Sequence, residues 1–145
     1  MKRAIKHTWV LPYPPEIVWE YLTKPDLLSQ WLMHNNFQPV IGHEFQFTAK
    51  PKIKIGFDGI IYCKVLEIIP YKRLSYTWKG GPAPDKITLD SVVVWTLNDK
   101  GQGTEIILEH NGFKGIKNII PFLMMDKGWV KILKRLRKHL DKFIK

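Results

Sequence analysis

The chain has 145 residues, of which 45% are hydrophobic and 25% charged, and its net charge is +10 at pH 7. These proportions exclude an intrinsically disordered chain, and the single Cys63 excludes an internal disulfide and every multi-cysteine metal site. No apolar run approaches the roughly 18 residues of a membrane span, and residues 1–7 lack the apolar stretch of a signal peptide, so we expect one cytoplasmic domain over residues 1–145.

The N-terminal part predicts one strand followed by two short helices. Residues 6–11 form the strand, and the prolines of residues 12–15 then break the chain. Proline also suits the first turn of a helix, because its fixed φ is already helical and its missing N–H is not needed there. Apolar residues at helical spacing continue this helix over 17–22, and residues 25–32 give a second amphipathic one.

After Gly42 the periodicity changes from helical to two, which indicates strands. Phe45 and Phe47 alternate with polar residues, and a loop rich in lysine, proline and glycine follows. Turn residues at 80–84 and the hairpin signal at 98–101 separate the later strands, and Gly112–Gly115 close the sheet. The predicted strands of this region are 44–48, 57–69, 74–78, 87–97 and 104–110.

The C-terminus predicts one long helix with two opposed faces from Trp129 onward. Its apolar residues recur every three or four positions and fall within an arc of roughly 120°. They are Trp129, Ile132, Leu133, Leu136, Leu140, Phe143 and Ile144, and Met125 extends the stripe toward the N-terminus. The remaining circumference is basic, with Lys127, Lys131, Lys134, Arg135, Arg137, Lys138, Lys142 and Lys145.

The basic side of this helix has three interpretations. Residues 121–145 contain eight Lys/Arg and two Asp, so +6 of the net +10 lies there. The side is either a solvated helix face, a nucleic-acid site or a surface that adsorbs to an anionic membrane. Nucleic-acid binding requires exposed aromatic residues among the cations, and here the aromatic residues lie on the opposite face. We therefore favour the solvated face and expect no nucleic-acid partner and no stable membrane insertion.

The order of elements predicts an α+β helix-grip fold. Its six- to seven-stranded antiparallel sheet curves around the C-terminal helix, and the two short helices follow the first strand. The terminal helix is the only element long enough to cover the sheet, so its apolar face is occupied within the fold. A strongly curved sheet around one helix rarely closes completely, and the gap between them is the expected pocket.

Short phrases in a fixed order through nearly the whole chain resemble a known family. They are residues 14–19, 23–27 with Trp31, Gly42 with Phe45 and Phe47, 59–70, 73–78, 103–110 with Gly112 and Phe113, and Gly128 with Trp129. The ordered set resembles the START-like (SRPBCC) helix-grip superfamily, in the branch related to the C-terminal domain of the activator of Hsp90 ATPase.

The resemblance implies a ligand cavity and leaves several activities open. Related branches bind lipids, hormones or polyketides, and some of them cyclise or dehydrate the bound ligand. The activator itself binds a chaperone, but there this domain is joined to a second, N-terminal domain. These 145 residues have no room for that second domain. A chaperone-interacting domain is therefore an alternative, and a hydrophobic small-molecule ligand is the partner that we favour.

Strand alternation and helical spacing predict which residues line the pocket between sheet and helix. Buried indole N–H groups need acceptors, and methionine adapts to ligands of variable shape, so this composition suits a lipid-like or polyketide-like molecule. For any single aliphatic residue, plain core packing is the better interpretation. The predicted ligand-binding residues are Trp31, Phe45, Phe47, Tyr76, Trp78, Trp95, His110, Phe113, Met125, Trp129 and Leu133.

Candidates for catalysis are few, and the sequence makes a non-enzymatic role the favoured one. His110, predicted on the inward face, is the strongest candidate for the general acid or base of a cyclase or dehydratase. A core histidine bonded to a neighbouring hydroxyl or carbonyl is the simpler interpretation. Glu67 reads as a solvated strand residue and Cys63 as a small buried one. The histidines are scattered without ligand spacing, so we expect no metal and no cofactor.

Overall fold

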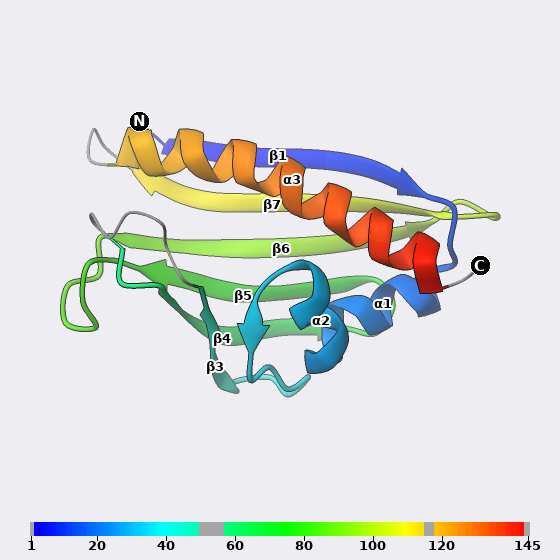
Figure 1. The fold of residues 1–145 in the computed structure, drawn as a ribbon, viewed down its shortest axis with the longest axis horizontal. Coiled ribbons are helices and arrows are strands. Elements are labelled where there is room, and N and C mark those ends of the chain that lie inside the picture. Colours follow the sequence, from blue (N-terminus) through cyan, green and yellow to red (C-terminus); the bar gives the residue numbers. More distant parts are fainter. Residues whose placement is uncertain (1, 50–56, 115–117, 144–145) are drawn as a thin grey trace.

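The computed structural model describes residues 2–49, 57–114 and 118–143. Within these ranges the chain forms one seven-stranded antiparallel sheet and three helices, which confirms the predicted helix-grip fold (Figure 1). The helices are α1 (Pro15–Thr23), α2 (Pro25–Trp31) and α3 (Ile119–Phe143). The strands are β1 (Lys2–Leu11), β2 (His34–Asn35), β3 (Glu44–Thr48), β4 (Ile60–Ile69), β5 (Arg73–Gly80), β6 (Leu89–Asp99) and β7 (Thr104–Lys114).

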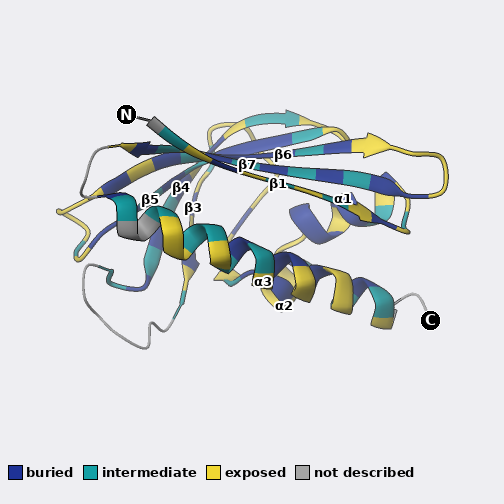
Figure 2. Cartoon of the chain, turned by 90° about the horizontal axis from the view of Figure 1, so that it is seen from above, coloured by how far each residue is buried: buried dark blue, intermediate teal, exposed yellow. Residues whose placement is uncertain are grey.

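The strand order is β1-β7-β6-β5-β4-β3-β2, so β2 to β7 pair in succession and β1 closes the row against β7. The three helices lie on one side of the sheet (Figures 1 and 2). Helix α3 runs along the sheet, and α1 and α2 lie near the C-terminal half of α3. Inward residues of the strands alternate with exposed ones, as the burial of Phe45 and Phe47 between exposed neighbours shows. The core therefore lies between the sheet and α3.

Several boundaries differ from the sequence-based expectation. Strand β4 begins at Ile60 instead of residue 57, and β6 begins at Leu89 instead of residue 87. Strand β7 continues through Gly112 to Lys114, because Gly112 adopts a φ of 119° and allows close approach to β6. A Cβ atom at this position would lie 2.8 Å from the carbonyl oxygen of Asp90. Helix α3 begins at Ile119, before Met125, where the predicted helical stripe starts. Pro121 lies in its first turn, where a proline costs no hydrogen bond.

Two strands also differ from expectation, and some expected features cannot be placed. Strand β1 begins at Lys2, earlier than residue 6, and the two-residue β2 was not predicted at all. The predicted loop at 50–56 and the helix residues Ile144 and Lys145 lie outside the described residues. Within the described ranges, no helix has the length and apolar content that a bilayer span requires.

The second half of α3 is fixed to the core by its apolar stripe. Trp129, Leu136 and Leu140 have no exposed surface, and Ile132 and Leu133 are also buried. The cations between them are exposed, which confirms the two-faced character of this helix. Each fully buried side chain of this size stabilises the fold by roughly 1.5–3 kcal/mol.

Candidate functional site

The side chains predicted to bind a ligand gather on the inner side of the sheet. Met125 is half-buried, and each of the other ten has an exposed fraction of 2% or less. They come from β3, β5, β6 and β7 on the sheet, from α2, and from α3 across the core. The expectation that they face the core is therefore met for all ten, but burial alone does not distinguish a ligand site from a packed interior.

Within the described residues, these side chains already contact one another. Measured between ring centroids, Trp129 lies 5.3 Å from Trp78 and 5.6 Å from Trp95. Trp31 meets Trp95 at 5.7 Å, and Phe47 meets Trp78 at 5.3 Å. A continuous layer of aromatic rings thus lies between the sheet and α3, and an occupant of this layer would have to separate some of them.

His110 sits in this layer with both ring nitrogens occupied. The indole N–H of Trp129 donates to Nδ1 of His110 at 3.0 Å. Since Nδ1 accepts, the ring proton is on Nε2, which donates to the hydroxyl oxygen of Ser91 at 2.8 Å. The Ser91 hydroxyl in turn donates to the backbone carbonyl of Trp78 at 2.6 Å. Each donor in this series of three hydrogen bonds has one acceptor.

This network assigns His110 a structural role. Burial lowers its pKa from 6.5 to about 3, because the charged ring would have no water around it. A protonated Nδ1 would also face the Trp129 donor, with two hydrogens between two nitrogens. The neutral ring therefore holds β7, β6 and α3 together, and it has no free nitrogen for a general acid or base. We accordingly propose no cyclase or dehydratase reaction.

Ser91 is the hydrogen-bond partner of His110 that the sequence did not predict. Its signal was present, since Ser91 shares the alternation of the inward residues Leu89 and Val93 and is a polar residue on an apolar stripe. Its pairing with His110 depends on the register of β6 against β7, which alternation within one strand does not give.

The four buried tryptophans of the layer differ in the hydrogen-bond acceptors of their indole N–H groups. Trp31 donates to the carbonyl of Tyr21 at 3.0 Å, and Trp95 donates to the hydroxyl of Tyr76 at 2.9 Å. Trp129 donates to His110. The N–H of Trp78 is buried and has no acceptor among the residues that the structure describes. Because buried polar groups are nearly always paired, this one donor stands out as a position where something else can bind.

A row of rings leads from Trp78 to the beginning of α3. Trp78 contacts His110 at 5.5 Å, and His110 contacts Phe113 at 4.7 Å. Phe113 then contacts the half-buried Phe122 at 5.5 Å. The next two residues of α3, Leu123 and Met124, are 53% and 68% exposed. The aromatic layer therefore reaches the surface at the first turns of α3.

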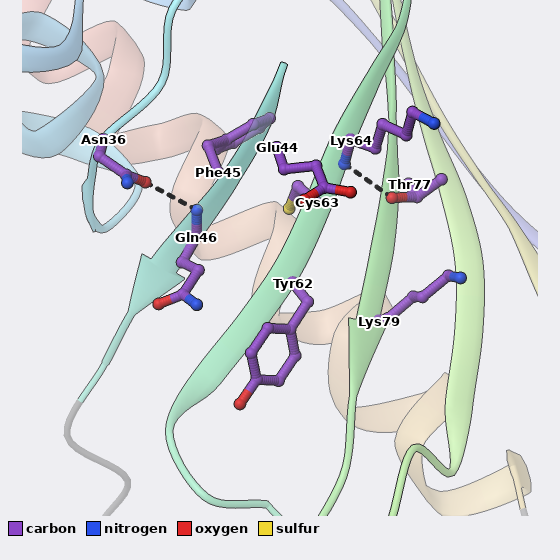
Figure 3. Close-up of a pocket in the computed structure, with 9 residues that line it drawn as sticks. All are labelled: Asn36, Glu44, Phe45, Gln46, Tyr62, Cys63, Lys64, Thr77 and Lys79. Atoms are coloured by element: carbon purple, nitrogen blue, oxygen red, sulfur yellow. Dashed lines mark hydrogen bonds between the residues drawn. The ribbon is translucent and has the colours of Figure 1, made fainter. Parts of the chain in front are cut away.

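Two hollows lie elsewhere on the molecule. One, of about 550 Å³, lies on the outer face of β3, β4 and β5, where Gln46, Tyr62 and Lys79 project away from α3 (Figure 3). Phe45 and Cys63 contribute to its floor, and Thr77 accepts a hydrogen bond from the backbone N–H of Lys64 at 2.8 Å. The other, of about 500 Å³, lies between the start of α1 and the turns at Tyr71 and Asp99. Both have mixed polar and apolar linings and are partly open. Neither is the pocket expected between the sheet and α3, since of the predicted ligand-binding residues Phe45 alone lines either hollow.

The minor candidates have structural explanations. Glu67 is half-exposed and pairs with Arg73. Cys63 is buried, and burial raises the pKa of its thiol, which keeps it protonated and unreactive. Among the described residues, no three side chains of the His, Cys, Asp or Glu type gather closely enough to hold a metal ion.

Comparison with known structures places this fold among solved proteins. Protein MLL2253 from Mesorhizobium loti is 34% identical, with a TM-score of 0.84 over 97% of this chain and 98% of that one. The Aha1 dimer from Colwellia psychrerythraea is 20% identical, with a TM-score of 0.73 over 93% of both chains. DynU16, a protein of the dynemicin biosynthetic locus, is 20% identical, with a TM-score of 0.75 over 95% of this chain and 47% of that one.

At 20% identity the last two likenesses concern the fold alone. No curated protein matches the chain. The family described as activator of Hsp90 ATPase homolog 1-like protein, however, matches residues 12–141, which is nearly all of the sequence and includes the whole aromatic layer from Trp31 to Trp129. The resemblance seen in the sequence is thereby confirmed, and the chain belongs to the activator of Hsp90 ATPase homolog 1-like family.

Proposed function

We propose that this protein binds a hydrophobic or aromatic small molecule that carries an oxygen acceptor, and that the molecule enters the aromatic layer beside Trp78. The observation that carries the proposal is the buried indole N–H of Trp78, for which residues 2–49, 57–114 and 118–143 provide no acceptor. An unpaired buried donor costs about 1–3 kcal/mol, and a ligand carbonyl, carboxylate or hydroxyl oxygen would remove that cost.

The surroundings of Trp78 favour such a ligand over a water molecule. A buried water needs two to four polar partners. The rings nearest to Trp78 are those of Phe47, His110 and Trp129, and the ring nitrogens of the last two are already engaged. A water at this position would therefore gain little beyond one hydrogen bond, whereas an aromatic or aliphatic ligand would also contact the rings.

Entry requires a movement of the first turns of α3. The rings of the layer are in contact, so a ligand needs Phe122 and Met125 to move away from the sheet. Two features make this movement inexpensive. Leu123 and Met124 are mostly exposed, so their movement costs little buried surface, and Gly128 is a residue of low helix propensity within the continuous helix. The segment from Ile119 to Gly128 thus acts as a lid over the layer.

The test follows the indole N–H signals of the six tryptophans by NMR. Trp78→Phe assigns the signal of Trp78, and sodium dodecanoate and 2-naphthoate serve as an aliphatic and an aromatic probe with the same carboxylate acceptor. We expect the Trp78 signal to move most and to saturate with at least one probe. The Trp95 signal, whose acceptor is Tyr76, should move little. Probe binding to Trp78→Phe should weaken by about ten-fold, the equivalent of one hydrogen bond.

Trp95→Phe is the matched control, because it deletes the same atoms from another buried tryptophan of the layer. It should leave the affinity for the probe closer to that of the unmodified protein than Trp78→Phe does. Native mass spectrometry of protein purified from its own host should in addition show a retained molecule. The proposal would be contradicted if the Trp78 NMR signal did not move with either probe and the native mass spectrum showed only the protein without a bound molecule.

A further inference from the structure

The outward side of α3 combines cations with exposed apolar residues in one stripe. At 100° per residue, Leu123 and Met124 lie within the same arc as the lysines that follow them. We call this stripe the outer face of α3, and Figure 2 shows its exposed residues turned away from the sheet. It consists of Leu123, Met124, Lys127, Lys131, Lys134, Arg135, Lys138 and Lys142, all of them exposed.

The acidic residues of α3 do not neutralise this face. Asp126 lies 2.9 Å from Nε2 of His7 on β1, at one edge of the stripe. Asp141 lies 3.4 Å from Nε of Arg137 and also accepts a hydrogen bond from the hydroxyl of Tyr13. Both carboxylates are thus engaged at the sides of the helix. Among the described residues, none of the six cations of the outer face has a carboxylate within ion-pair distance.

The two apolar residues are not explained by a solvated face. Leu123 and Met124 are 53% and 68% exposed, although they occupy the same face as the lysines and lie directly before them. Helices that lie on bilayers have this composition, in which apolar side chains enter the acyl boundary and long cationic ones reach the lipid phosphates. The distance from Lys127 to Lys142 is about 22 Å at 1.5 Å per residue, so the face can contact several headgroups at once.

We propose that the outer face of α3 binds the surface of an anionic phospholipid bilayer, with Leu123 and Met124 inserted at the interface and the six cations on headgroup phosphates. The apolar stripe on the other side of α3 stays in the core, so binding is peripheral. A lipid surface fits better than a nucleic acid, because the face is a convex cylinder without exposed aromatic rings for bases to stack on. The proposal does not depend on what the aromatic layer binds.

The test is flotation with lipid vesicles. We expect the protein to float with vesicles of phosphatidylcholine and phosphatidylglycerol at 7:3, but not with phosphatidylcholine alone, and to be released as salt rises and screens the charges. Lys131→Glu combined with Lys134→Glu and Lys138→Glu should lower the partition coefficient more than about ten-fold. Leu123→Ser combined with Met124→Ser should lower it about five-fold while leaving its retention on heparin unchanged.

The control reverses three lysines that are exposed elsewhere, Lys64, Lys72 and Lys86, each to Glu, and so makes the same change in net charge. It should retain most of the vesicle binding, and circular dichroism should show all variants folded. Equal loss in both triple variants would overturn the proposal, because net charge alone would then explain the binding. It would also fail if a DNA duplex bound as tightly as the vesicles, or if replacing Leu123 and Met124 had no effect on flotation.

Discussion

The two halves of α3 perform different tasks, and Gly128 separates them. After Gly128, the residues Trp129, Leu136 and Leu140 have no exposed surface and hold the helix on the sheet. Before Gly128, Leu123 and Met124 point into solvent, and Phe122 is only half-buried. One helix thus contains a half that is anchored in the core by buried side chains and a half whose described side chains are exposed or only half-buried.

This difference indicates how a packed core can still admit a ligand. A domain whose helix were buried along its whole length would have to lose much of its core to open. Here the second half can remain in place while the first half moves, since local opening costs least where few apolar contacts are lost. The predictions below separate the two halves by stability, by protonation and by motion.

The largest effect on stability should come from pH, acting on His110, which accepts a hydrogen bond from Trp129 in the second half of α3. His110 has a folded-state pKa of about 3 against an unfolded value of 6.5, so the unfolded chain binds a proton first as the pH falls. The contribution of neutral His110 to the free energy of unfolding is fully present above pH 6.5. It is lost progressively between pH 6.5 and 3, at about 1.4 kcal/mol per pH unit, or about 4 kcal/mol over three units. Urea unfolding at several pH values measures this loss.

His110→Gln is the reference for that measurement. The glutamine amide can still accept from Trp129 and donate to Ser91, but it does not titrate. The difference in stability between the protein and this variant should therefore shrink steadily as the pH falls. If the two curves ran parallel between pH 6.5 and 3, His110 would not be the titrating group.

Leu136→Ala and Leu123→Ala compare the two halves of α3 directly. Leu136 is fully buried, so its truncation leaves a cavity and should lower the free energy of unfolding by about 3 kcal/mol. Leu123 is 53% exposed, and the same truncation there should change it by less than about 0.5 kcal/mol. Chemical denaturation gives both values. Similar losses at the two positions would show that the first half is also part of the stabilising core.

Trp129→Phe and Trp78→Phe compare a paired and an unpaired indole N–H. Both changes delete the same atoms from neighbouring buried rings, whose centroids lie 5.3 Å apart. Trp129→Phe also leaves Nδ1 of His110 without its donor, whereas Trp78→Phe deprives no acceptor. We expect Trp129→Phe to be more destabilising by about 1–3 kcal/mol, measured on the ligand-free protein. Equal losses would mean that the Trp78 N–H has an acceptor in solution.

Sequence reasoning predicted the features that depend on periodicity. The alternation around Phe45 and Phe47 and the stripe from Trp129 to Leu140 identified sheet, helix and inward residues correctly. Residues 119–124 were not predicted as helix because all six are apolar, so no polar face reveals a helical period. Likewise β2 is two residues long, which is too short for any alternation to show.

The site itself was less accessible to sequence reasoning. The network of Ser91, His110 and Trp129 requires the register between strands and the placement of α3, and both arise from the packing of distant segments. The sequence indicated that the buried indoles need acceptors, but not which one lacks its acceptor. That distinction separates Trp78 from Trp31, Trp95 and Trp129, and only the arrangement in space provides it.

Gly128→Ala should have the smallest effect on stability and still test the division of α3. A methyl group built at this position meets nothing within 4 Å outside the helix itself, so alanine fits without strain. The variant should gain about 0.5–1 kcal/mol from helix propensity and from a less flexible unfolded chain. Hydrogen exchange should slow at residues 122–127 more than at 132–140, and probe entry should slow with it. If exchange slowed equally in both segments, or if entry were unchanged, Gly128 would not separate a movable lid from a fixed anchor.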